Sequence, residues 1–201
     1  MRWVRLACVM MATVLTGAAP LLGQTESPPA SGGEAKAAEL RLENVAGRLR
    51  QTMTFATLAV LSPTLSDHRL HAQRIVNWLE GSGGRHFVPR VSPEGEIRGL
   101  IEEAQALVPW LAGRALDQPT REQALFFARN VKAFLELALE SALSAANQRR
   151  LDQGIDDMRK TFAYLSAALG WESGPAYLGG VLVLMHLLPP SSTSGDSATG
   201  L

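Results

Sequence analysis

Apolar residues recur along the chain every three or four positions, which is the spacing of one face of an α-helix. In residues 34–61, six of them fall on one stripe: Leu42, Val45, Leu49, Met53, Ala56 and Val60. The same spacing predicts further helices over 66–81, 94–116, from 117–120 to about 146, 148–169 and 176–188. No stretch shows the sustained alternation of apolar and polar residues that is typical of a strand. We therefore predict an all-α fold, an antiparallel helical bundle of five or six helices.

The residues at the ends of these segments are those that begin or stop helices. Ser66 is the expected N-cap of the second helix, and Gly81 is its expected C-cap. Asp117 or Thr120 is expected to cap the helix that follows them. Gly170 is expected to end the helix over 148–169.

The N-terminus has the order of a secretory signal peptide. Arg2 and Arg5 form a short positive region, an uncharged run follows from Leu6 to Leu22, and small residues occupy 17–19. We predict that residues 1–23 are a signal peptide and that the mature chain is exported, to a periplasm or out of the cell. The alternative is an uncleaved N-terminal anchor, because a run of 17 uncharged residues is at the lower limit of a membrane span.

Polar segments flank the predicted bundle. Residues 24–33 and 189–201 are rich in Pro, Gly, Ser and Thr, and we expect a disordered linker and a disordered tail there. The bundle domain is expected over 34–188. Its last segment, 176–188, is apolar on all sides but too short to cross a bilayer, so we expect a buried closing helix and no membrane span in the mature chain.

Composition and motifs exclude several function classes. Lysine and arginine equal aspartate and glutamate at 19 each, and removal of Arg2 and Arg5 leaves 17 against 19, or a net charge of −2. Without a concentrated basic patch, nucleic-acid binding is not expected. Cys8, the single cysteine, lies in the predicted signal peptide, so the mature chain has no disulfide, thiol nucleophile or Cys-x-x-Cys-His haem attachment. The serine-hydrolase G-x-S-x-G and zinc-hydrolase H-E-x-x-H motifs are also absent.

Two of the four histidines, His68 and His71, lie three residues apart in the second helical segment, on the side expected to point inward. One interpretation is that they bind a transition metal or a haem iron inside the bundle, with His186 as a third ligand or His86 in its place. The other is that each ring is neutral and hydrogen-bonded to a backbone carbonyl or a buried carboxylate. We favour the second because no Glu-x-x-His motif accompanies the pair.

The remaining polar residues are assigned to solvent or to local structure. Asn77 is expected to pin the glycine-rich loop that follows it, and Glu80 is expected to be solvated. The adjacent acidic pairs Glu102–Glu103 and Asp156–Asp157 diverge around their helices, so we expect solvated faces.

These observations favour an exported, non-catalytic helical bundle that binds a protein partner or a small ligand. The alternative function is a metal- or haem-binding bundle that uses His68 and His71.

Overall fold

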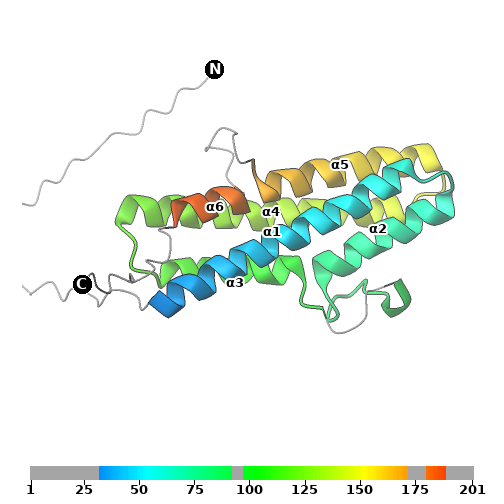
Figure 1. Cartoon of the computed structure of the whole chain (residues 1–201). Coiled ribbons are helices and arrows are strands. Elements are labelled where there is room, and N and C mark those ends of the chain that lie inside the picture. The colour runs from blue at the N-terminus through cyan, green and yellow to red at the C-terminus, as the bar shows by residue number, and fades with distance from the viewer. Residues whose placement is uncertain (1–31, 92–96, 172–179, 189–201) are drawn as a thin grey trace, which may run out of the picture.

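The computed structural model of the chain describes residues 32–91, 97–171 and 180–188, and the side chains among them from residue 40 onward. These residues form six α-helices and one short 3-10 helix, without a strand, which confirms the predicted all-α bundle (Figure 1). The helices are α1 (Gly32–Leu61), α2 (Leu65–Glu80), α3 (Leu100–Ala112), α4 (Gln118–Asn147), α5 (Leu151–Leu169) and α6 (Val181–Leu187), and the 3-10 helix η1 covers Pro89–Val91.

Two long helical hairpins, α1–α2 and α4–α5, lie side by side (Figure 1). Helix α4 is central, because it packs against α2, α3 and α5. Helix α3 lies on α4 and passes beneath the N-terminal half of α1, and the short α6 packs on α1 and α4 (Figure 1). This arrangement places the start of α3 beside the middle of α1.

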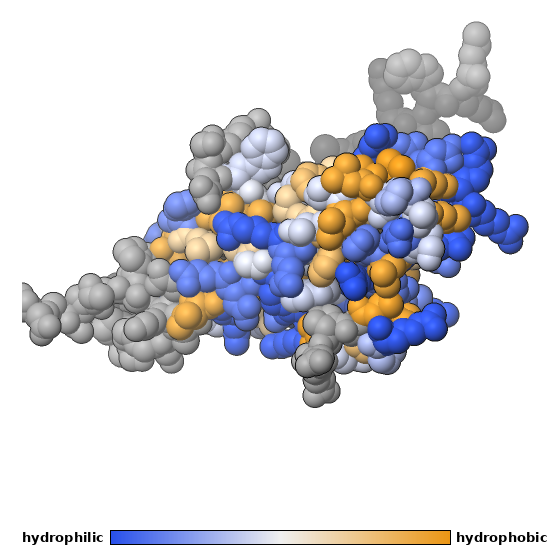
Figure 2. Space-filling model, turned by 45° about the vertical axis from the view of Figure 1, so that its right-hand side comes forward, coloured by the Kyte–Doolittle hydropathy of each residue, from blue (hydrophilic) through white to orange (hydrophobic). Residues whose placement is uncertain are grey.

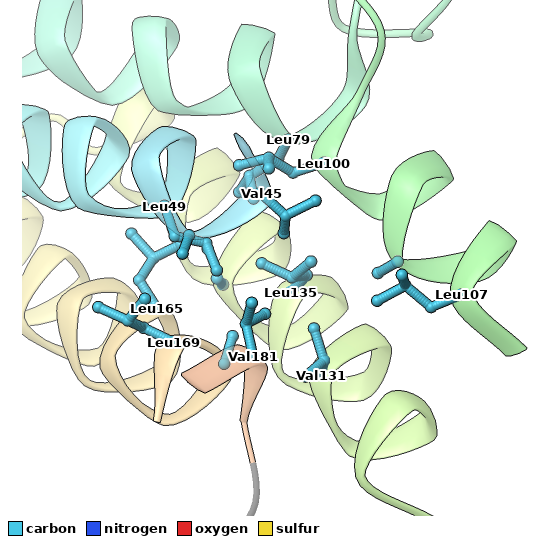
Figure 3. Close-up of a cluster of buried hydrophobic side chains, with 14 of the residues drawn as sticks. Val45, Leu49, Leu79, Leu100, Leu107, Val131, Leu135, Leu165, Leu169 and Val181 are labelled. Atoms are coloured by element: carbon cyan, nitrogen blue, oxygen red, sulfur yellow. The ribbon is translucent and has the colours of Figure 1, made fainter. Parts of the chain in front are cut away.

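The apolar stripes of the helices meet in one core (Figure 3). Its fully buried side chains come from every helix and include Leu49, Leu79, Leu107, Leu135, Leu165 and Leu184. In the predicted stripe of α1, four residues are buried, while Met53 and Val60 pack at the core's edge. Burial of a leucine side chain stabilises a fold by roughly 1.5–3 kcal/mol, so this core is the main source of stability.

The helix caps agree with the sequence only in part. Thr64, not Ser66, caps α2: its hydroxyl oxygen accepts the Asp67 backbone N–H at 3.1 Å. Of the two candidates for α4, Asp117 is the cap, and its carboxylate accepts the Thr120 N–H at 3.0 Å. The cap thus lies two residues before the expected one, and α2 begins at Leu65.

Helix α3 begins at Leu100, six residues later than expected. The Ser82 N–H donates to the Ile97 carbonyl at 2.8 Å, and the Ile97 N–H donates to the Ser82 hydroxyl oxygen at 2.7 Å. Gly99 then passes so close to α2 that an added Cβ would lie 2.3 Å from the Glu80 carbonyl oxygen. The apolar Ile97 suggested helix by its spacing, but its backbone pairs with the end of α2 instead.

Several predicted segments lie wholly or partly outside the described residues. These are the signal peptide 1–23, the linker up to residue 31, the tail 189–201 and the first residues of the closing helix, of which α6 is the described part. Gly32 and Gly33, expected in the linker, belong to α1. None of the described helices combines the length and apolar content needed to cross a membrane.

Candidate functional site

His68 is completely buried where α1, α2 and α5 meet. Its Nδ1 lies 2.9 Å from the Ala59 carbonyl oxygen, and because a carbonyl only accepts, Nδ1 carries the proton. Nε2 is buried, has no hydrogen-bond partner in the part of the chain that the structure describes, and faces the backbone of Gly154, where an added Cβ would lie 2.5 Å from it. The expected bond to a backbone carbonyl is therefore confirmed for His68, and the helix α5 backbone covers its second nitrogen.

His71 lies in the seam between α1 and α2. Its ring stacks on Phe55 at a centroid distance of 6.4 Å, and the Arg74 guanidinium lies 5.6 Å from the Phe55 ring centroid. Burial, and then the positive charge of Arg74, lower the pKa of His71. Its Nδ1 has no hydrogen-bond partner among the described residues, so the expected bond to a carbonyl or carboxylate is not found for this ring.

The other histidines lie elsewhere. His86 is an exposed loop residue whose Nδ1 lies 2.7 Å from Glu80 Oε1, and His186 is exposed on α6, at the other end of the bundle from the α1–α2 turn (Figure 1). The described residues contain no group of three or more His, Cys, Asp or Glu side chains placed to hold a metal ion. The structure thus brings His68 and His71 near each other but does not bring His186 to them.

Two polar residues at the end of α2 hold the loop that follows. The Asn77 amide nitrogen donates to the Val88 carbonyl at 2.8 Å and its oxygen accepts the Val88 N–H at 3.0 Å, which confirms that Asn77 pins this loop. Glu80 was expected to be solvated, and this is wrong: its carboxylate accepts the His86 backbone N–H at 2.7 Å, besides contacting the ring. The loop thus folds back against the last turns of α2.

A pocket of about 340 Å³ lies between the N-terminal half of α1 and the start of α3. Three residues of α1 and three from the α3 side line it: Leu40, Arg41, Asn44, Arg98, Glu103 and Ala106. Its volume is at the lower end of the range for small-molecule sites.

Arg48 fixes the geometry beside this pocket. Its guanidinium donates to Glu103 Oε1 at 2.5 Å and to the Arg98 carbonyl at 2.5 Å, and it lies 5.1 Å from the ring centroid of Trp78. Arg48 and Glu103 are only 13% and 14% exposed at their side chains. One side chain of α1 thereby holds both the start of α3 and the end of α2.

This contact provides a hydrogen-bond partner for only one of the two carboxylate oxygens of Glu103. Its Oε1 pairs with Arg48, whereas its Oε2 is buried and has no hydrogen-bond partner among the described residues. Burial raises the pKa of Glu103, and the opposing charges of Arg48 and Arg98 do not fully offset it. An unpaired buried acceptor costs about 1–3 kcal/mol, and such groups in native proteins call for an explanation.

The pocket and its margin carry an excess of positive charge. Arg41 is exposed, and Arg98 pairs through Nε with Glu102 Oε1 at 2.9 Å in an exposed contact. With Arg48 and Glu103 included, three guanidinium groups face two carboxylates. This balance favours an anionic group in the pocket.

The inward position of Glu103 was not predicted, because the adjacent residues Glu102 and Glu103 were both expected to be solvated. Successive residues on a helix point about 100° apart, so Glu102 is exposed while Glu103 turns inward. Asp157 was assigned to solvent in the same way, yet it accepts the Ser144 hydroxyl at 2.7 Å and the Gln148 amide at 2.8 Å.

A scan against protein-family models and searches of curated proteins and of solved structures found no match to the chain.

Proposed function

We propose that this protein is an exported helical bundle that binds a small ligand in the α1–α3 pocket and acts as a binding module without catalysis. The observation that carries the proposal is the buried, unpartnered oxygen of Glu103 at the wall of a pocket of about 340 Å³. A hydrogen-bond donor on a ligand satisfies this oxygen once the carboxylate turns toward the pocket, and the bond is strengthened by the low dielectric of a half-buried site.

The described lining residues favour binding over catalysis. They include no His, Cys, Ser or Lys, and the carboxylate of Glu103 is already paired with Arg48. Nucleophilic and general acid–base catalysis need an activated nucleophile or a freely titrating partner within reach of the substrate.

The surface favours a small ligand over a large docking partner. On the face shown in Figure 2, hydrophobic side chains lie in separate groups divided by hydrophilic ones. The large exposed apolar residues are spread over different helices, among them Leu61 of α1, Phe126 of α4 and Phe162 of α5. Dispersed apolar residues of this kind are ordinary on a protein surface.

Ligand binding is tested by native mass spectrometry of the exported protein after incubation with a small-molecule extract of the expression host. The matched control is the double variant Arg41→Ala/Arg98→Ala, because both side chains are exposed and their loss leaves the core intact. We expect an added mass on the unmodified protein that the variant lacks. An unmodified protein without any adduct, or an equal adduct on both proteins, contradicts the proposal.

Export rests on the signal-peptide pattern of residues 1–23. Expression of the full chain in a bacterial host, followed by cell fractionation and intact-mass measurement, tests it. We expect the product outside the cytoplasm, shortened by about 23 residues. A full-length product in the cytosol contradicts export, and a full-length product in the membrane fraction supports the anchor instead.

Metal or haem binding through His68, His71 and His186 stays a prediction from the sequence. Elemental analysis and a visible absorption spectrum of the same exported protein test it directly.

A further inference from the structure

We infer that the pocket between α1 and α3 takes a small carboxylic acid with a hydrogen-bond donor next to its carboxylate, that is, a 2-hydroxy acid or a 2-amino acid. This inference rests on the proposed function, since it names the ligand class of the same pocket.

The carboxylate is assigned from the charged walls. Arg41 makes no ion pair among the described residues, and Arg98 uses only its Nε toward Glu102, in a contact that is exposed to water. Guanidinium groups bind carboxylates through paired, charge-assisted N–H···O bonds. Two such groups on opposite walls, one from α1 and one from the start of α3, give a carboxylate two places to bind.

The donor is assigned from Glu103. An ionised carboxylate only accepts hydrogen bonds, and Arg48 already donates to Oε1, so the free Oε2 calls for a donor. Glu103 lines the pocket, and because the last torsion of a glutamate side chain is broad, its carboxylate can turn until Oε2 faces a ligand there. A ligand with acceptors alone meets this oxygen with repulsion, whereas a hydroxyl or ammonium group binds it.

The volume of the pocket and its apolar lining residues indicate what the remainder of the ligand is. Leu40 is 56% exposed and lines the pocket together with Ala106, so an apolar body has a surface to cover. The Asn44 amide supplies one more donor and one more acceptor at the α1 wall.

Three matched probes test the inference by isothermal titration calorimetry on the exported protein: 3-phenylpropionate, 3-phenyllactate and phenylalanine. They share a carboxylate and an aromatic body and differ at the carbon next to the carboxylate, which carries hydrogen, hydroxyl or ammonium. We expect 3-phenyllactate or phenylalanine to bind about tenfold or more tightly than 3-phenylpropionate, the effect of one hydrogen bond to a charged group.

Two variants separate the roles of the walls. Glu103→Gln keeps the side-chain size and is expected to reduce the preference for the donor-bearing probes to a few-fold. Arg41→Ala is expected to weaken all three probes to a similar degree and leave the preference unchanged. Circular dichroism checks that each variant is folded, and the comparison of probes on the unmodified protein stands without either variant.

Two outcomes overturn the ligand class. One outcome is equal affinity for all three probes, or an undiminished preference for the donor-bearing probes in Glu103→Gln. Either result shows that the pocket binds carboxylates but that Glu103 does not recognise a hydrogen-bond donor on them. Absence of binding of every probe at millimolar concentration shows that the ligand is of another class, and the mass-spectrometric adduct then decides the proposed function separately.

Discussion

Two buried polar side chains in this bundle look alike in their bonding and differ in their surroundings. His68 and Glu103 each have one atom bonded, to the Ala59 carbonyl and to Arg48, and one buried atom that has no partner among residues 32–91, 97–171 and 180–188. The free atom of His68 lies against the backbone of Gly154, whereas Glu103 borders a pocket of about 340 Å³. An unpartnered atom therefore points to a ligand only where there is room for one.

The difference in charge adds to the difference in space. Leaving a neutral ring nitrogen unpaired costs far less than leaving an ionised carboxylate oxygen unpaired. The His68 junction is also held from outside, since Arg69 of α2 donates through Nε to the Gln148 carbonyl at the α4–α5 turn at 3.0 Å. We therefore interpret the contact of His68 with Ala59 and Gly154 as a purely structural one, which we call the closed joint. The pocket beside Glu103 and Arg48 is interpreted as a binding site, which we call the open site.

The largest expected effect is the loss of Arg48. Arg48→Ala leaves the carboxylate of Glu103 without its hydrogen-bonded ion-pair partner and removes the contact with Trp78, so we expect a loss of about 3 kcal/mol in the free energy of unfolding. Urea denaturation measures it. Arg48→Lys, which keeps the charge but loses the fork of donors, is the control and is expected to lose about half as much. A loss below about 1 kcal/mol for Arg48→Ala contradicts the role of Arg48 as the anchor of this corner.

The next effect tests the closed joint. Gly154→Ala places a methyl group against His68 Nε2, and overpacking of this kind costs about 2 kcal/mol. In a His68→Ala background the same change is expected to cost little, because the ring is gone and the methyl group enters the space it leaves. Urea denaturation of the two single variants and the double variant measures the coupling.

Gly47→Ala is the matched control for that cycle. Gly47 lies within α1 with open space around its Cβ position, so alanine there is expected to stabilise the protein by about 0.5–1 kcal/mol. If Gly154→Ala lowers the free energy of unfolding equally with and without His68, the proposed packing of His68 against Gly154 is contradicted.

A smaller effect concerns pH at the open site. Burial raises the pKa of Glu103 above its ordinary 4.5, so the folded protein keeps a proton that the unfolded chain has released. The contribution of Glu103 to stability therefore falls as pH rises from about 4.5 through the raised value. Relative to the unmodified protein, Glu103→Gln is expected to gain stability as pH rises through this window. Parallel curves of unfolding free energy against pH for the two proteins contradict this assignment.

The smallest effect has the opposite sign. Burial, and then Arg74, lower the pKa of His71 below its ordinary 6.5, so the unfolded chain binds the proton more tightly than the folded protein does. The contribution of His71 to the stability of the folded protein is fully present above pH 6.5. It is lost as the pH falls through the lowered pKa of His71 in the folded protein. His71→Gln is expected to flatten this part of the curve by a small amount, since the ring is only half-buried. Chemical denaturation between pH 5 and 8 measures it, and an unchanged slope contradicts the prediction.

The helices were predictable from the sequence because each buries one face, and a stripe such as that of α1 repeats at the helical period whatever its partners are. Gly81 and Gly170 also marked helix ends correctly, both with positive φ. The start of α3 was not predictable, because the pairing of Ile97 with Ser82 joins two segments that only the fold brings together.

The sequence by itself determined the helical class of this protein, most of its helix boundaries and the role of Asn77. The helices depend on residues within about one or two turns of each other, and Asn77 bonds to Val88, 11 positions further along the chain. The tertiary structure decided which polar residues turn inward together. Arg48 and Glu103 are 55 positions apart, and neither has a local feature that marks it as half of a buried pair. Pairing between helices depends on how their faces are oriented against one another, and that orientation is set by the packing of the whole core.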